Sequence, residues 1–202
     1  GGAGSVLRVA GGNLSVNAQK SAVTCHHSVE VNNGVLTLSA QNDALKASPS
    51  DSDTESSGNI TINGGTVTVS AVGDGISADG LLSIFGGTVV VTTTGEVASS
   101  TNDFGGMGGG TPAPPGQPRT ESTEEASSKG IKSGSAMKIT GGIITVSSTD
   151  HAIHCPGETV VKGGNITLSS SAGNGISTHG NLTVSGSAQI CVKTAVEGIE
   201  SK

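Results

Sequence analysis

Short stretches of alternating apolar and polar residues run along most of the chain, separated by Gly, Asn, Asp and Ser. A period of two is typical of β-strands with one buried face. The stretch TINGGTVTVSAVGDGISADG (61–80) returns as VKGGNITLSSSAGNGISTHG (161–180), so the same strands occur again in the same order. The chain is therefore predicted to be all-β and built from a repeated unit.

A glycine pair marks each repeat. Successive pairs are 22, 31, 22, 55 and 22 residues apart, which indicates a period of 22 with insertions of 9 and 33 residues at 48–57 and 96–128. Glycine is expected at these places because a tight corner between two strands requires positive φ. The pairs are Gly11 and Gly12, Asn33 and Gly34, Gly64 and Gly65, Gly86 and Gly87, Gly141 and Gly142, and Gly163 and Gly164.

Each repeat predicts three short strands whose apolar residues recur in columns. Stacked about 4.8 Å apart, such columns form a right-handed single-stranded parallel β-helix, with about 22 residues and three strands per coil and roughly seven coils. One domain covers 1–202, expected to be a piece of a longer protein because EGIESK resembles the start of a further repeat. A β-sandwich is the alternative, but sandwiches do not keep a 22-residue register. The first-strand column is Val23, Leu45, Ile76, Ile131, Ile153, Ile176 and Ile199.

Acidic residues recur in the turn two positions before this column. Asp43 and Asp74 fall on adjacent coils, so their carboxylates require a cation, a raised pKa or divergent rotamers. Calcium is the natural cation for carboxylates and turn carbonyls. A second acidic group, Asp51, Asp53 and Glu55 with Asp79 in the next coil, is a further candidate. For both groups the alternative is that acidic residues simply suit turns and solvated loops.

The third strand of each repeat exposes hydroxyl side chains in rows. This flat face is a candidate surface for a glycan, for ice or for another copy of the chain, although Thr and Ser are also ordinary choices at exposed strand positions. The first row contains Thr37, Thr68, Thr145 and Thr167, and the row two residues on contains Ser39, Ser70, Thr92, Ser147 and Ser169.

Composition excludes several functions. A net charge of -6 argues against nucleic acid, which requires a dense cationic face. No run of 18 apolar residues is present, so membrane insertion is not expected. No catalytic motif stands out, and without Trp or Tyr the usual aromatic platform of a glycoside hydrolase is missing, so the chain is not expected to be an enzyme. Cys25 and Cys155 are expected to point inward and Cys191 outward, with no disulfide.

The runs GGTVTVSAVGDGISADG, SSKGIKSG and STDHAIHCPGETVVKGG, with the closing AVEGIESK, resemble a bacterial family of secreted, calcium-containing β-helix carbohydrate-binding domains. That family is related in fold to pectate lyases and is non-catalytic. The resemblance covers nearly the whole chain. It implies an extracellular or cell-surface protein that binds acidic plant polysaccharide or cellulose.

The acid pattern of that family is only partly kept here. The family has two adjacent acids before the apolar residue and a His after it. In this chain Asp150 keeps the first acid while His151 replaces the second, and His154 matches the following His. The positions carried over as calcium ligands are Asp43, Asp74, Asp79 and Asp150.

Two functions follow from the sequence. The first is a non-catalytic module that binds polysaccharide, with calcium at turn carboxylates. The alternative is a structural or adhesive surface protein that self-associates, for example into a filament, through coil stacking or through its Thr and Ser face.

Overall fold

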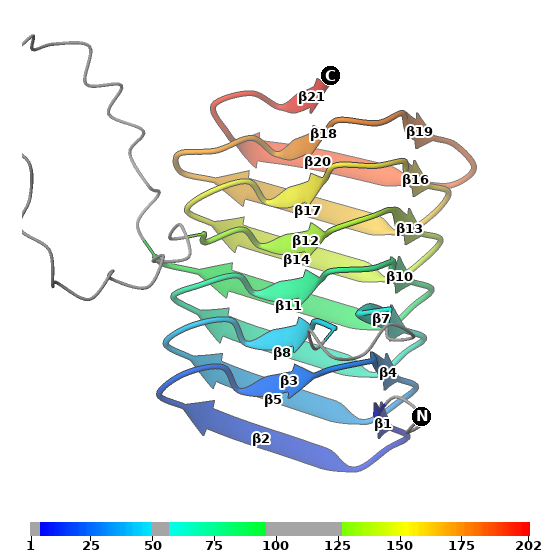
Figure 1. The fold of residues 1–202 in the computed structure, drawn as a ribbon. Helices are drawn as coiled ribbons and strands as arrows, with labels where there is room; N and C mark the ends of the chain where they lie inside the picture. The colour runs from blue at the N-terminus through cyan, green and yellow to red at the C-terminus, as the bar shows by residue number, and fades with distance from the viewer. Residues whose placement is uncertain (1–4, 50–56, 96–126) are drawn as a thin grey trace, which may run out of the picture.

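The computed structural model describes residues 5–49, 57–95 and 127–202. These residues form short strands and turns, with no helix among them. The strands wind into seven stacked coils, and the first and last described coils lie at opposite ends of the stack (Figure 1). The insertions predicted at 48–57 and 96–128 fall almost wholly outside the described residues.

Each coil contributes one strand to each of three seven-stranded sheets, here called A, B and C. Sheet A consists of β1 (Val6–Val9), β4 (Ser28–Val31), β7 (Asn59–Ile62), β10 (Leu82–Ile84), β13 (Met137–Ile139), β16 (Thr159–Val161) and β19 (Leu182–Val184). Sheet B consists of β2 (Asn13–Ala18), β5 (Val35–Ala40), β8 (Thr66–Ala71), β11 (Thr88–Thr93), β14 (Ile143–Ser148), β17 (Asn165–Ser170) and β20 (Gln189–Thr194). Sheet C consists of β3 (Val23–Cys25), β6 (Leu45–Ala47), β9 (Ile76–Ala78), β12 (Ile131–Ser133), β15 (Ile153–Cys155), β18 (Ile176–Thr178) and β21 (Ile199–Ser201).

All of the strand pairings between neighbouring coils are parallel, which confirms the parallel β-helix and excludes the sandwich. The register follows the repeat. In sheet C, Leu45 pairs with Ile76 and Ile76 with Ile131, although these pairs are separated by 31 and 55 residues. The insertions therefore leave the stacking of the coils unchanged.

The core is a column of aliphatic side chains inside the three sheets. Along most strands of the inner coils, inward residues are buried and their neighbours face outward, as in Thr66–Ala71, where Val67 and Val69 are buried. Cys25 and Cys155 belong to this core, Cys191 is exposed, and all three cysteines are free, as predicted. Because the core has no aromatic centre, its stability depends on in-register contacts between like residues of adjacent coils.

The corner between sheets A and B requires glycine. The second residue of every predicted pair has positive φ, for example 81° at Gly65 and 87° at Gly87. A Cβ on Gly87 would lie 2.6 Å from the carbonyl oxygen of Gly65 one coil below. Both the backbone conformation and the close approach of adjacent coils therefore exclude a side chain here.

Ile143 and Ile144 offer a test of the core. Ile144 is fully buried, whereas the adjacent Ile143 is 58% exposed. Ile144→Ala should lower the free energy of unfolding by about 2–5 kcal/mol because it leaves a cavity between two coils. Ile143→Ala should change it by less than about 0.5 kcal/mol. Urea denaturation measures both, and equal losses would contradict the inward and outward assignment.

Candidate functional site

The turn that leads into sheet C contains a ladder of polar contacts between coils. The Asp43 carboxylate accepts the backbone N–H of Asp74 at 2.9 Å, and the Asp74 carboxylate accepts the N–H of Lys129 at 2.9 Å. In the next coil Lys129 occupies the turn position, and its side chain cannot accept a hydrogen bond. The N–H of His151 is accepted instead by the carboxylate of Asp150 at 2.7 Å. Asp43 and Asp74 therefore bind main-chain donors of the next coil, whereas Asp150 binds a main-chain donor of its own coil.

Each of these carboxylates also faces a lysine. Lys46 Nζ lies 3.3 Å from Asp43 Oδ2, Lys132 Nζ lies 3.5 Å from Asp74 Oδ2, and Lys129 Nζ lies 2.7 Å from Asp150 Oδ2. The three carboxylates are largely buried, with side-chain exposures of 10%, 4% and 11%. Lysine ammonium groups thus supply the positive charge that stacked acids require.

The pKa values of two of these acids shift in opposite directions. Burial raises the pKa of Asp43, and the nearby charge of Asp74 adds to this rise. Burial acts in the same sense on Asp150, but its hydrogen bond and charge pairing with Lys129 outweigh that effect, so the pKa of Asp150 is lowered. The raised pKa of Asp43 is one of the outcomes expected for acids on adjacent coils.

Histidines continue the polar face of sheet C. The rings of His151 and His154 stack with centroids 5.4 Å apart, and His179 meets His154 edge-on at 5.7 Å. Burial, with the positive charge of Lys129 next in importance, lowers the pKa of His154 to about 4, so this imidazole is neutral at pH 7. Burial also lowers the pKa of His151, whose Nδ1 accepts the N–H of Asn174 at 2.9 Å.

The calcium site that the sequence predicts falls only partly within the described residues. No three of the described His, Cys, Asp and Glu residues converge at a point that could hold a metal ion. Asp79 is exposed and accepts the Ser48 hydroxyl at 2.6 Å. Asp51 and Asp53 lie outside the described residues, so the structure does not test the second predicted acidic group.

The predicted hydroxyl rows lie on the outer face of sheet B. Thr37 pairs with Thr68, and Thr145 pairs with Thr167, all on strands that place their neighbours in the core. Val90 stands between Thr68 and Thr145 and interrupts the row. The structure therefore brings the four predicted threonines into one line across the sheet.

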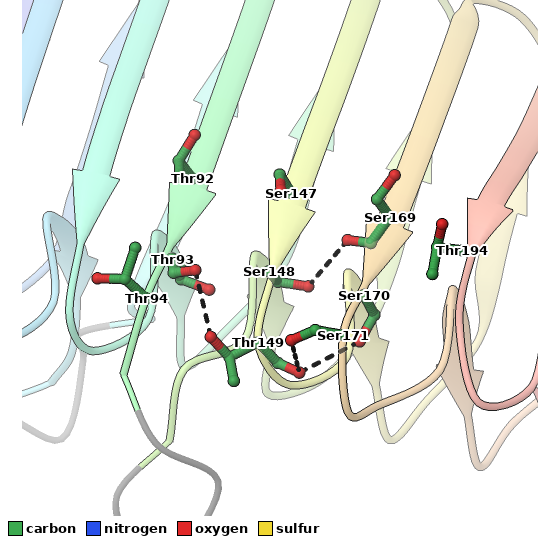
Figure 2. Close-up of a pocket in the computed structure, with 10 residues that line it drawn as sticks. All are labelled: Thr92, Thr93, Thr94, Ser147, Ser148, Thr149, Ser169, Ser170, Ser171 and Thr194. Atoms are coloured by element: carbon green, nitrogen blue, oxygen red, sulfur yellow. Dashed lines mark hydrogen bonds between the residues drawn. The ribbon is translucent and has the colours of Figure 1, made fainter.

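A groove of about 450 Å³ lies at the end of sheet B where the chain turns toward sheet C (Figure 2). It crosses four neighbouring strands, a width of about 14 Å at about 4.8 Å per spacing. All of its lining residues are serine or threonine: Thr92, Thr93, Thr94, Ser147, Ser148, Thr149, Ser169, Ser170, Ser171 and Thr194.

The lining hydroxyls are of two kinds. Inward hydroxyls are bound by the main chain: Thr93 donates to the carbonyl of Ser128 at 2.5 Å and Ser170 to that of Asp150 at 2.8 Å. Outward hydroxyls of Thr92, Ser147 and Ser169 have no hydrogen-bond partner within the described segments, and Figure 2 shows them side by side on adjacent strands. The first kind fixes the shape of the groove, and the second can donate to and accept from a ligand.

Sequence reasoning missed both the lysines and the groove. Two of the lysines, Lys46 and Lys132, stand three residues after the turn positions of Asp43 and Lys129, a spacing visible in the repeat. The sequence feature that indicates the groove is a triplet of hydroxyl residues at equivalent places in three coils. These triplets are TTT (92–94), SST (147–149) and SSS (169–171).

Asp43 and Asp150 should respond differently to removal of their charge. At pH 7, Asp150→Asn should cost about 2 kcal/mol because it removes a charged hydrogen bond to Lys129. Asp43→Asn should be neutral or raise the melting temperature, because burial destabilises that carboxylate while an amide oxygen can still accept the N–H of Asp74.

The pH dependence separates the two cases further. The lowered pKa of Asp150 means that its contribution is present at neutral pH and is lost as the pH falls through the folded-state pKa. For Asp43 the raised pKa means that stability is lost as the pH rises through the folded-state value, so the advantage of Asp43→Asn should grow there. Melting temperatures from pH 3 to pH 8 test both, and an identical response of the two variants would contradict the assignment.

The comparisons with known proteins place the chain in a family. A family model described as "Carbohydrate-binding domain-containing protein" matches residues 3–175, which include six of the seven strands in sheet B and all of the groove except Thr194. Neither a curated protein nor a solved structure matches the chain. The chain belongs to the family of carbohydrate-binding domain-containing proteins.

Proposed function

We propose that this protein is a non-catalytic extracellular module that binds a polysaccharide chain in the hydroxyl groove of sheet B. The observation that carries the proposal is the groove itself, about 450 Å³ in volume and lined only by Ser and Thr. This volume lies within the usual range of small-ligand sites. Family membership supports carbohydrate as the ligand.

The chemistry of the groove favours an uncharged glycan. None of its lining side chains is charged, and the unpaired hydroxyls of Thr92, Ser147 and Ser169 can each donate and accept, as sugar hydroxyls also do. Of the two ligands expected from the sequence, cellulose fits this groove better than an acidic polysaccharide, whose carboxylates would find no cation among the ten lining residues.

The same lining supports binding without cleavage. Glycoside hydrolysis by the common route requires a pair of carboxyl groups, one as acid and one as base or nucleophile. Serine and threonine hydroxyls do not titrate near neutral pH and cannot take these roles unaided. A chain held in this groove would therefore be bound intact.

The extracellular location rests on the family resemblance in the sequence. Within the described segments no helix is long and apolar enough to cross a bilayer. Binding of a polymeric glycan outside the cell is compatible with the absence of any disulfide among Cys25, Cys155 and Cys191.

Self-association remains a second candidate function. The flat outer face of sheet B repeats hydroxyl side chains from coil to coil, with Thr37 beside Thr68 and Thr145 beside Thr167. Two such faces could pack against each other. Light scattering across a concentration series measures this directly, and a monomer throughout would contradict it.

Calcium stays a prediction of the sequence, and titration with calcium tests it. Binding at Asp74 would have to displace Lys132, so a calcium-dependent rise in melting temperature should be lost in Asp74→Asn and enlarged in Lys132→Gln. The prediction is contradicted if millimolar calcium leaves the melting temperature of the wild type, Asp74→Asn and Lys132→Gln unchanged. Lys132 and its neighbours would then be the permanent counter-charges of the turn.

Removal of the outward hydroxyls tests the groove. Ser147→Val combined with Ser169→Val should weaken retention on cellulose by about thirtyfold, since each of the two lost hydrogen bonds contributes about 1 kcal/mol and the replacements suit strands. Affinity electrophoresis or a pull-down on insoluble cellulose measures the change, with thermal melts confirming that the variant is folded.

Ser39→Val is the matched control because Ser39 occupies the same row of sheet B outside the groove. It should bind as the wild type does. If Thr145→Val and Thr167→Val reduce binding while the groove variant does not, the ligand lies on the predicted threonine row instead. Full retention by all variants would rule out sheet B as the binding face.

A further inference from the structure

The groove covers only part of sheet B, and the sequence changes where the groove begins. Its described lining residues all belong to coils 4 to 7, the coils that contain β11, β14, β17 and β20. In coils 1 to 3 the last inward position of the sheet B strand is alanine, at Ala18, Ala40 and Ala71. In coils 4 to 6 the same position is a hydroxyl residue, at Thr93, Ser148 and Ser170. The groove therefore begins where an inward methyl group is replaced by an inward hydroxyl.

The inward hydroxyls fix the turn beside the groove. Thr93 donates to the carbonyl of Ser128 at 2.5 Å, in the turn that follows its own strand. Ser148 donates in the same way to the carbonyl of Asp150 at 2.5 Å, and Ser170 reaches that carbonyl from the next coil at 2.8 Å. An alanine side chain cannot donate, so it cannot make this link between the end of the strand and the turn.

The residue that follows the inward position ties neighbouring coils together. Thr149 donates to the carbonyl of Thr93 at 3.4 Å, and Ser171 donates to the carbonyl of Thr149 at 3.5 Å (Figure 2). In coil 3 this place is taken by Val72, which is 38% exposed and has no polar side-chain atom. An apolar side chain therefore limits the groove at the coil 3 end.

A β-bulge brings a hydroxyl into the row at the other end of the groove. Between β17 and β20 the register shifts, so that Ser169 pairs with Thr194 and Lys193 is left without a place in the ladder. A bulge of this kind changes the direction of the side chains that follow it. The outward row consequently has a hydroxyl in each of four consecutive coils, at Thr92, Ser147, Ser169 and Thr194.

We propose that the groove holds a linear neutral glycan that runs across the strands with one sugar residue per coil, and that Thr93, Ser148 and Ser170 are positioning residues that set the length of the bound segment. Equivalent hydroxyls repeat about every 4.8 Å along the coils, so a polymer of identical sugars can make the same contact at each step. The four coils that line the groove then offer four sugar positions. This inference rests on the proposed function and adds the direction and the length of the bound segment.

Cello-oligosaccharides of two to six glucose residues test the length of the site by isothermal titration calorimetry. The affinity of the wild type should rise up to four residues and then stay constant. Ala71→Ser combined with Val72→Ser changes the coil 3 triplet from SAV to SSS, the triplet of coil 6, and should move this limit to five residues. Ala40→Ser combined with Gln41→Ser creates the same triplet in coil 2, which is not adjacent to the groove, so the limit should stay at four.

Substitution of the inward hydroxyls tests their positioning role. Ser148→Ala and Ser170→Ala each leave the outward row intact, yet each should weaken binding of cellotetraose by about fivefold because the turn beside the groove is no longer fixed. Ser170→Thr should bind as the wild type does, because threonine is the natural residue at this position in coil 4. Alanine is natural there in coils 1 to 3, so the alanine variants should fold, and thermal melts check this for every variant.

The outcomes separate this inference from the proposed function. If the wild type binds neither cellulose nor cello-oligosaccharides, both are overturned. If binding depends on Ser147 and Ser169 but the alanine variants bind as the wild type does, only this inference is overturned. The same holds if the folded coil 3 variant keeps the length limit of the wild type.

Discussion

In-register stacking of parallel strands is the constraint on which the rest of this structure depends. Leu45, Ile76, Ile131, Ile153 and Ile176 lie one above another, and each is at most 1% exposed. A shift of one residue in any coil would turn its whole apolar set outward. Each coil is therefore positioned by its neighbours, and the residues on every outer surface recur with the same 22-residue period as the core.

The same register creates a difficulty for charged residues, because like side chains stack on like. The turn before sheet C resolves it in three ways. Asp43 and Asp74 accept main-chain N–H groups of the next coil, Lys46 and Lys132 face these two acids, and Lys129 occupies the turn position between Asp74 and His151. On sheet B the stacked residues are neutral hydroxyls, which can be repeated without repulsion, so an extended binding groove can form there.

The fold could be predicted from the sequence because the core columns and the corner glycines are local features of each repeat. The line of Thr37, Thr68, Thr145 and Thr167 followed from the same register. The pairing of Lys129 with Asp150 could not, since it depends on the side-chain path between two coils. The buried hydroxyls of Thr93, Ser148 and Ser170 were missed for another reason: their positions alternate as core positions do, and only the carbonyls at the turn explain them.

The spacing of the coils along the sequence has a broader consequence. Ile76 and Ile131 are stacking partners although the chain between them is 33 residues longer than one period. The entropy of closing such an excursion grows slowly, by about 0.6 kcal/mol for each doubling of its length. Turns of this solenoid can therefore accept foreign segments at a small cost in free energy. The coil is thus a suitable scaffold for peptide display. In natural variants, insertions at the turns can add new surface while the core residues stay the same.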